Sequence, residues 1–173
     1  MLSKIKFLII VLVLCALSLP AYAGSLERDS WSVSPMLGVG YETRGDNDVM
    51  GHASLGLAYR FSIPLSLRLA VGGIYLRTPD YEDFHEHVSL SLLYHFYEKD
   101  LFNPYLVFGG DLMLSAMDAD LHIGLGNTFP ITDKISVFVE GSFGTNVVLY
   151  WDGQNANDRR YHGRLTTGVS FHF

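Results

Sequence analysis

The chain has 173 residues, a length typical of a single domain. It carries twelve Lys and Arg residues against eighteen Asp and Glu residues, and this acidic balance argues against nucleic-acid binding. A single cysteine, Cys15, leaves no disulfide framework.

Residues 1–23 have the order of a secretory signal peptide. Two lysines precede the apolar run 7–19, and small residues follow it up to Ala23. The run is shorter than the roughly 20 residues that a spanning helix needs. We expect cleavage after Ala23, which removes two of the twelve basic residues and the cysteine and leaves 24–173 as one β-barrel domain of net charge −8.

Apolar and polar side chains alternate through most of the remaining chain, and no segment after residue 23 shows a helical period. This pattern predicts eight strands of roughly ten residues, the length that crosses a bilayer at a tilt. The apolar rows occupy residues 31–41, 53–61, 65–75, 88–96, 106–114, 121–129, 135–143 and 161–173.

The connections between these strands differ in length and charge. Short, turn-like connections are predicted at 62–64, 98–103 and 130–134, and longer, charged ones at 42–50, 77–84 and 147–160, with one tight turn at 115–119. In outer-membrane barrels the short turns face the periplasm. Both termini are therefore expected on the periplasmic side, because the number of strands is even.

A soluble, lipocalin-like barrel is the alternative fold that the same alternation of apolar and polar side chains could predict. Such a barrel would bury its apolar rows and cover its outside with Lys and Glu, yet the only lysines after residue 23, Lys99 and Lys134, fall in predicted turns. The polar rows are rich in small residues, which suit a narrow lumen. Aromatic residues also gather near strand ends, such as Trp31 and Phe96 at one end and Tyr75 at the other. These features favour a membrane barrel.

The last thirteen residues form an alternating strand that ends on an aromatic ring. Its apolar row includes Leu165, Thr167, Val169, Phe171 and Phe173. This row resembles the signal read by the barrel-assembly machinery, and segment 31–173 resembles the small eight-stranded outer-membrane proteins typified by the OmpA membrane domain and OmpX. The resemblance implies an all-β, eight-stranded antiparallel up-and-down transmembrane β-barrel in the bacterial outer membrane. We expect the protein to be a monomer without a cofactor.

Charged and titratable side chains on the inward rows form the main candidate site. They are Arg68, Asp111, His122, Glu140 and Arg164. Arg68 and Glu140 are placed near the mid-height of the barrel, and the other three lie slightly farther from the predicted periplasmic turns. Because an unpaired charge in a narrow lumen is costly, we expect opposite charges to pair and close the lumen as an ionic plug. A gate that switches partners and passes small ions is the alternative.

Histidines are frequent on the predicted lumen face. Four of them project inward from the outer half of the barrel: His52, His87, His122 and His162. Asp111, Asp120 and Glu86 could complete a nitrogen–oxygen metal site with them. Apart from segment 85–87, where two imidazoles share one strand face, no pair of histidines has the close spacing of a known metal motif. We therefore expect the lumen histidines to be hydrogen-bonded and to bind no metal.

An enzymatic function is the alternative to a structural or binding role, because some eight-stranded barrels modify lipid A or phospholipid. A lipid-facing hydrolase would need Ser, His and an acid on the outward rows, which hold almost only aliphatic and aromatic residues. Ser170 and His172 are predicted to face the lumen, and a charged lumen argues against an apolar acyl cavity. We therefore expect no catalytic residues.

The predicted outer connections carry arginines among many acidic residues. The arginines are Arg44, Arg77, Arg159 and Arg160. We expect them to contact lipopolysaccharide phosphates, with solvated loop charges as the alternative. The sequence thus predicts an integral outer-membrane barrel with a structural or surface-interaction role, and outer-membrane lipid and lipopolysaccharide as its partners. A narrow pore for small solutes or ions and a lipid A- or phospholipid-modifying enzyme remain the alternatives.

Overall fold

A computed structural model describes most of the predicted barrel. The described residues are 29–43, 48–77, 82–96, 102–115, 118–147 and 160–173. The predicted signal peptide and its cleavage after Ala23 lie outside them and stay predictions. Within the described ranges, no helix has the length and apolar character needed to cross a membrane.

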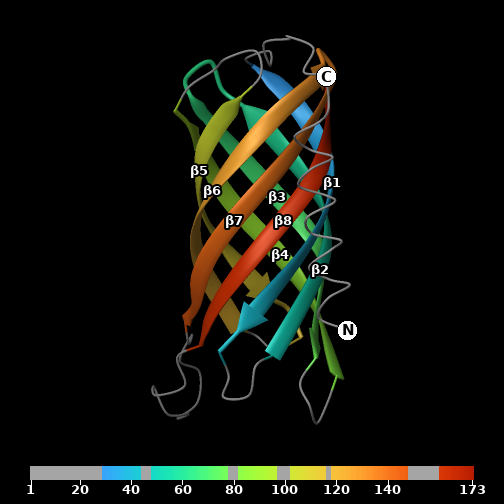
Figure 1. Cartoon of the computed structure of the whole chain (residues 1–173), viewed down its shortest axis with the longest axis vertical. Helices are drawn as coiled ribbons and strands as arrows, with labels where there is room; N and C mark the ends of the chain where they lie inside the picture. Colours follow the sequence, from blue (N-terminus) through green and yellow to red (C-terminus); the bar gives the residue numbers. More distant parts are fainter. Residues whose placement is uncertain (1–28, 44–47, 78–81, 97–101, 116–117, 148–159) are drawn as a thin grey trace.

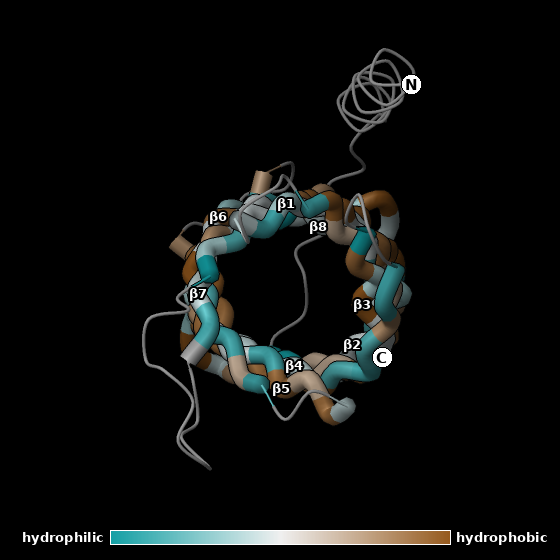
Figure 2. Tube along the Cα trace, turned by 90° about the horizontal axis from the view of Figure 1, so that it is seen from below, coloured by the Kyte–Doolittle hydropathy of each residue, from teal (hydrophilic) through white to brown (hydrophobic). Residues whose placement is uncertain are grey.

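Eight antiparallel strands form one closed barrel, as the sequence predicts (Figures 1 and 2). They are β1 (Ser30–Glu42), β2 (Asp48–Arg60), β3 (Leu65–Arg77), β4 (Glu82–His95), β5 (Asn103–Met113), β6 (Asp118–Thr132), β7 (Ile135–Val147) and β8 (Tyr161–His172). Each strand pairs with the next in the chain, and β8 pairs with β1 to close the ring. Closure leaves no exposed sheet edge, which a bilayer requires.

The strands are longer than the predicted ten residues, ranging from 11 in β5 to 15 in β6. Charged residues continue the ladder past the apolar rows, as in the pairs Glu42↔Asp48 and Arg77↔Glu82. The connections predicted at 42–50 and 77–84 are accordingly too long, since hydrogen-bonded pairing does not require apolar side chains.

The turn predicted at 130–134 is also shorter than expected. β6 continues through Pro130 to Thr132, and only residues 133–134 form the turn. The register shifts between Pro130 and Thr132, which marks a bulge or a similar irregularity. A bulge accommodates a proline, because a proline has no N–H to donate to the ladder.

The two faces of the barrel wall have opposite polarity. Outward side chains are large, apolar and exposed, for example Leu37 (64%), Leu90 (54%) and Leu125 (62%), whereas inward positions such as Ser91 and Ser136 are buried. This pattern is the inverse of a soluble barrel and is typical of strands that face lipid. The lipocalin-like alternative is therefore excluded, and the barrel is transmembrane.

We call the end that carries the turns at 62–64 and 133–134 and the carboxyl terminus the turn end, and the opposite end the loop end (Figure 1). Aromatic rings contact one another at both. Tyr59 lies 4.9 Å from Trp31 at the turn end, and Phe143 stacks on Tyr161 at the loop end with 6.1 Å between centroids. Such rings are typical of the two membrane–water interfaces.

Candidate functional site

A buried ion pair occupies the middle of the lumen. Arg68 Nη2 of β3 donates hydrogen bonds to Glu140 Oε2 and Oε1 of β7 at 2.9 and 3.2 Å. The Tyr105 hydroxyl of β5 donates to the same Glu140 Oε2 at 3.2 Å. We call these three residues the central group. Because all three are buried, the carboxylate is stabilised by protein donors in place of water.

The central group spans the lumen. Strands β3 and β7 lie four places apart in the ring of eight, so Arg68 and Glu140 reach each other from opposite walls. The Arg68 guanidinium also lies 5.8 Å from the centre of the Phe138 ring, a cation–π distance. A Cβ at Gly126, which pairs with Tyr105, would overlap the tyrosine ring. The absence of a side chain at Gly126 therefore makes room for Tyr105.

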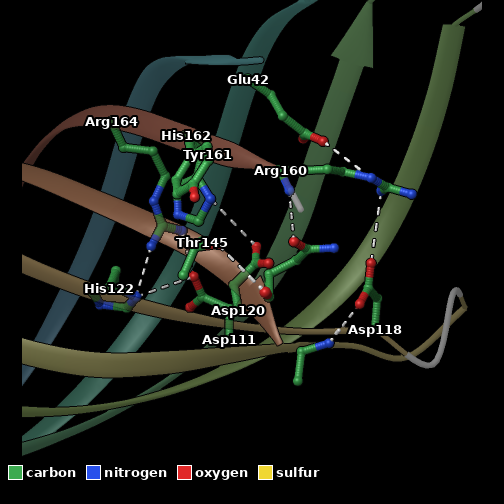
Figure 3. Close-up of polar contacts among 12 residues, drawn as sticks. Glu42, Asp111, Asp118, Asp120, His122, Thr145, Arg160, Tyr161, His162 and Arg164 are labelled. Atoms are coloured by element: carbon green, nitrogen blue, oxygen red, sulfur yellow. Dashed lines mark hydrogen bonds and ion pairs between the residues drawn. The ribbon is translucent and has the colours of Figure 1, made fainter. Parts of the chain in front are cut away.

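A second group joins the other three predicted lumen residues, and we call it the upper group. Arg164 Nη1 of β8 forms an ion pair with Asp111 Oδ2 of β5 at 2.5 Å, and Arg164 Nη2 lies 2.8 Å from His122 Nδ1 of β6 (Figure 3). His122 Nδ1 is also 3.4 Å from Asp111 Oδ2. A guanidinium only donates hydrogen bonds, so in its contact with Arg164 the His122 Nδ1 atom can take part only as the acceptor.

Charged residues also meet at the loop end. Arg160 approaches Glu42 at 3.8 Å and Asp118 at 3.7 Å, as Figure 3 shows. The Glu42 and Asp118 side chains are only 8% and 19% exposed, so Arg160 is directed toward the barrel mouth. By contrast, the Arg77 side chain is 61% exposed and lies 3.5 Å from Glu82. The other two predicted lipopolysaccharide contacts, Arg44 and Arg159, lie outside the described residues.

Three of the four predicted lumen histidines, His52, His122 and His162, contact hydrogen-bonding or charged groups on other strands. His52 lies 3.3 Å from the Thr166 hydroxyl, and His162 lies 3.8 Å from Asp120. Among the residues that the structure describes, no three His, Cys, Asp or Glu side chains are grouped so as to hold a metal ion. The suggestion that Glu86 could complete such a site is wrong, because Glu86 is exposed on the outer face while its neighbour His87 is buried in the lumen.

Sequence reasoning missed a set of hydroxyl–imidazole contacts at the turn end. Ser66 lies 2.9 Å from His95, and Ser136 lies 2.8 Å from His172. Ser170, predicted to face the lumen, contacts Ser34 there at 2.7 Å. The alternation that placed Arg68 on the inward row also places Ser66 there, so the signal was available.

The predicted assembly row lies on the lipid face of β8. Leu165 is 38% exposed, Phe171 42% and Phe173 74%, and Val169 is half-buried between them. The backbone N–H of Phe173 donates to Trp31 O at 2.9 Å, and Trp31 N donates back at 3.3 Å. The last residue therefore takes part in barrel closure, while recognition by the assembly machinery remains a prediction.

Comparison with known proteins supports the architecture. No protein-family model and no curated protein matches the sequence. Neisserial surface protein A (NspA) is similar in structure, with a TM-score of 0.60 and 16% identity over 83% of this chain and 97% of its own. The chain has the fold of the small outer-membrane β-barrel proteins. Ail, the attachment invasion locus protein of Yersinia pestis, is also similar in a complex with the heparin analogue sucrose octasulfate, at a TM-score of 0.55 and 12% identity over 85% of this chain and all of that one.

This fold confirms the resemblance inferred from the sequence. Identities of 16% and 12% show a shared fold and nothing about a shared activity. Within this fold lumen-facing and lipid-facing side chains alternate, so the central and upper groups project into the lumen and away from the lipid face.

Proposed function

We propose that the protein is an integral protein of the bacterial outer membrane whose barrel is closed to ions and serves a structural or surface-interaction role. The observation that carries the proposal is the ion pair of Arg68 and Glu140, which joins opposite walls of the lumen. In the proposed orientation the turn end faces the periplasm, because short turns belong there.

Energetics favour a plug over a gate. Separating a buried ion pair leaves two desolvated charges, and losing one partner costs about 3–5 kcal/mol in such sites. Tyr105 adds a third donor on the same carboxylate, so a switch of partners would also break that hydrogen bond. The interior of an eight-stranded barrel is normally filled by side chains. Together these points support a lumen that stays closed.

The loop end supports a surface role. Its described charges include Arg77 and Glu82, whose side chains are 61% and 57% exposed and available to partners outside the barrel. We propose that Arg77, with Arg44 and Arg159, contacts phosphates of lipopolysaccharide. Arg160 is the weakest of the four predicted contacts, since it is held by Glu42 and Asp118 at the mouth.

Single-channel recording in planar bilayers tests the closed lumen. The wild-type barrel should show no steady conductance, and Arg68→Ala with Glu140→Ala should conduct. The matched control is Arg77→Ala with Glu82→Ala, which removes an exposed ion pair and should behave like the wild type. Steady conductance of the wild-type protein would instead support the narrow pore.

Cysteine labelling on intact cells tests the orientation. Cys15 is the only cysteine of the chain and belongs to the predicted signal peptide. Maleimide labelling of the mature protein therefore reports only on a single introduced cysteine. Glu82→Cys at the loop end should react with a membrane-impermeant maleimide, and Lys134→Cys at the turn end should react only after the outer membrane is opened. The reverse result would invert the proposed topology.

A further inference from the structure

A cavity of about 30 Å³ lies inside the lumen, between the central group and the upper group. Arg68 and Glu140 line it from the central group, and all three residues of the upper group line it too. Every strand contributes to its wall, so the barrel surrounds it on all sides. We call it the mid-lumen cavity. Its remaining polar wall residues are His52, Ser54, His87, Ser89, Ser142 and Thr166.

The formal charges of this wall cancel while its histidines are neutral. The central and upper groups each pair an arginine with a carboxylate, so both carboxylates that line the cavity are already held by a guanidinium. The histidines of the wall are His52, His87 and His122. The two arginines, two carboxylates and three histidines come one from each of β2 to β8, and the β1 wall residue is the uncharged Met36. A proton taken up by a histidine therefore adds a positive charge for which the described wall holds no further carboxylate.

The unpaired groups of the wall are nitrogens. His87 is 4% exposed and forms no hydrogen bond or ion pair with any residue that the structure describes. Its Nδ1, the Nδ1 of His52 and the Nε of Arg164 are buried atoms without a hydrogen-bond partner. An arginine Nε–H always donates, and an imidazole carries at least one N–H. Because a buried donor without an acceptor is costly, this wall favours a ligand that accepts hydrogen bonds.

The size of the cavity limits which acceptor fits. A buried water needs at least about 10–15 Å³ of such space, so the mid-lumen cavity holds roughly two waters or one monatomic anion. Phosphate or sulfate, with four oxygens, needs roughly 40–60 Å³ by the same measure. Chloride is small, accepts hydrogen bonds and donates none. It therefore matches both the volume and the unpaired donors.

We propose that the mid-lumen cavity binds one chloride ion, and that protonation of the lumen histidines strengthens this binding. The unpaired nitrogens and the wall hydroxyls supply hydrogen bonds to the ion, and the protonated imidazoles supply the balancing charge. Access from the loop end does not require Arg68 and Glu140 to separate, so the site is compatible with a lumen that conducts no ions. The inference does not depend on the proposed function.

Titration of the refolded protein with sodium chloride tests the proposal. The protein is held in a non-ionic detergent and a gluconate buffer of constant ionic strength, at about pH 7.5 and about pH 5.5, between which histidine gains its charge. Binding is followed by calorimetry and by the histidine side-chain signals in NMR spectra. We expect saturable one-to-one binding that shifts the signals of His52 and His87 and leaves that of His172 at the turn end unchanged. Affinity should rise on acidification, by up to about tenfold per pH unit for each proton taken up with the ion.

Two variants locate the site. His87→Leu should weaken chloride binding by at least about tenfold, because it removes a buried donor and a positive charge at acid pH. His172→Leu, the same change at the turn end, should bind chloride as the wild type does. If His87→Leu does not refold, Ser142→Ala serves as the second variant and should weaken binding several-fold. Bromide should replace chloride, and sulfate should not.

Several results would overturn the proposal. The absence of saturable binding at both pH values would mean that the cavity holds water alone. Equal shifts with sulfate, or an equal shift of His172, would show an effect of salt on the whole barrel. A folded His87→Leu or Ser142→Ala barrel that binds with wild-type affinity would place the ion elsewhere. Equal affinity at the two pH values would refute the coupling to the histidines.

Discussion

Arg68 and Glu140 form a 2.9 Å ion pair from strands that face each other across the barrel. Their side chains are 10% and 5% exposed, so neither charge has bulk water as an alternative partner. The stability of each charge therefore depends on the other, and this dependence can be measured.

A double-mutant cycle measures that coupling. Arg68→Met and Glu140→Gln should each destabilise the inserted barrel by about 3–5 kcal/mol, because each leaves one buried charge unpaired. The double variant should cost less than either single variant, since it removes both charges together. The measurement is the free energy of unfolding by urea in lipid vesicles.

The exposed ion pair at the loop end supplies the control for this cycle. The same two substitutions at Arg77 and Glu82 should give a coupling energy below about 1 kcal/mol, because solvent screens exposed charges. A coupling energy of zero between Arg68 and Glu140 would mean that they do not interact, and the proposed plug would lose its main support.

Gly126 provides a second test of how the lumen is filled. Gly126→Ala places a methyl group against the Tyr105 ring, which must move away from Glu140. We expect a loss of about 1–3 kcal/mol in unfolding free energy, the usual cost of overpacking. Gly141→Ala is the matched control, because an added Cβ there has no neighbour within 4 Å. Equal stability of the two variants would show that Tyr105 is not held as described.

Alternation explains why much of this architecture could be predicted. Side chains of a strand alternate strictly, so one correctly assigned residue fixes the facing of a whole strand. Alternation therefore places Arg68, Asp111, Glu140 and Arg164 on the inward face, and their heights in the barrel predict which charges meet. The error at Glu86 came from proximity in sequence to two histidines, where the same alternation already directed its side chain outward.

The remaining features depend on information that alternation does not carry. Charge patterning does not predict the role of Tyr105, because this residue contributes a neutral hydroxyl donor that fits beside Gly126. The position of Arg160 depends on the predicted connection 147–160, whose sequence shows no alternation of apolar and polar residues. The predicted strands are too short at the loop end, because Glu42 and Asp48 pair through their backbones whatever their side chains are.

The lipid face can be tested by comparing one substitution at two depths. Leu90 and Ile63 are equally exposed, at 54% and 53%, but Leu90 lies within β4 and Ile63 lies in the turn at 62–64. Leu90→Arg should cost about 2–4 kcal/mol and Ile63→Arg about 0–1 kcal/mol, because the penalty for a charge falls from the bilayer midplane to its surface. Urea unfolding in vesicles measures both. Equal penalties would contradict the placement of the outer face in lipid.

The carboxyl terminus gives the last prediction. Deleting Phe173 removes the two backbone hydrogen bonds that it exchanges with Trp31 and the terminal ring of the predicted assembly signal. We expect a lower yield of inserted barrel with undiminished export to the periplasm, because export depends on the amino-terminal signal instead. Quantitative blotting of membrane and periplasmic fractions measures both pools.

The control for this deletion is Phe96→Ala. Phe96 is another exposed aromatic ring at the turn end, next to β4, and it lies outside the predicted assembly row. If the deletion lowers insertion and Phe96→Ala does not, the effect belongs to the terminal residue and not to the loss of any interfacial ring. Unchanged surface levels after the deletion would show that barrel closure at Trp31 and assembly proceed without Phe173, and the predicted assembly signal would have to be abandoned.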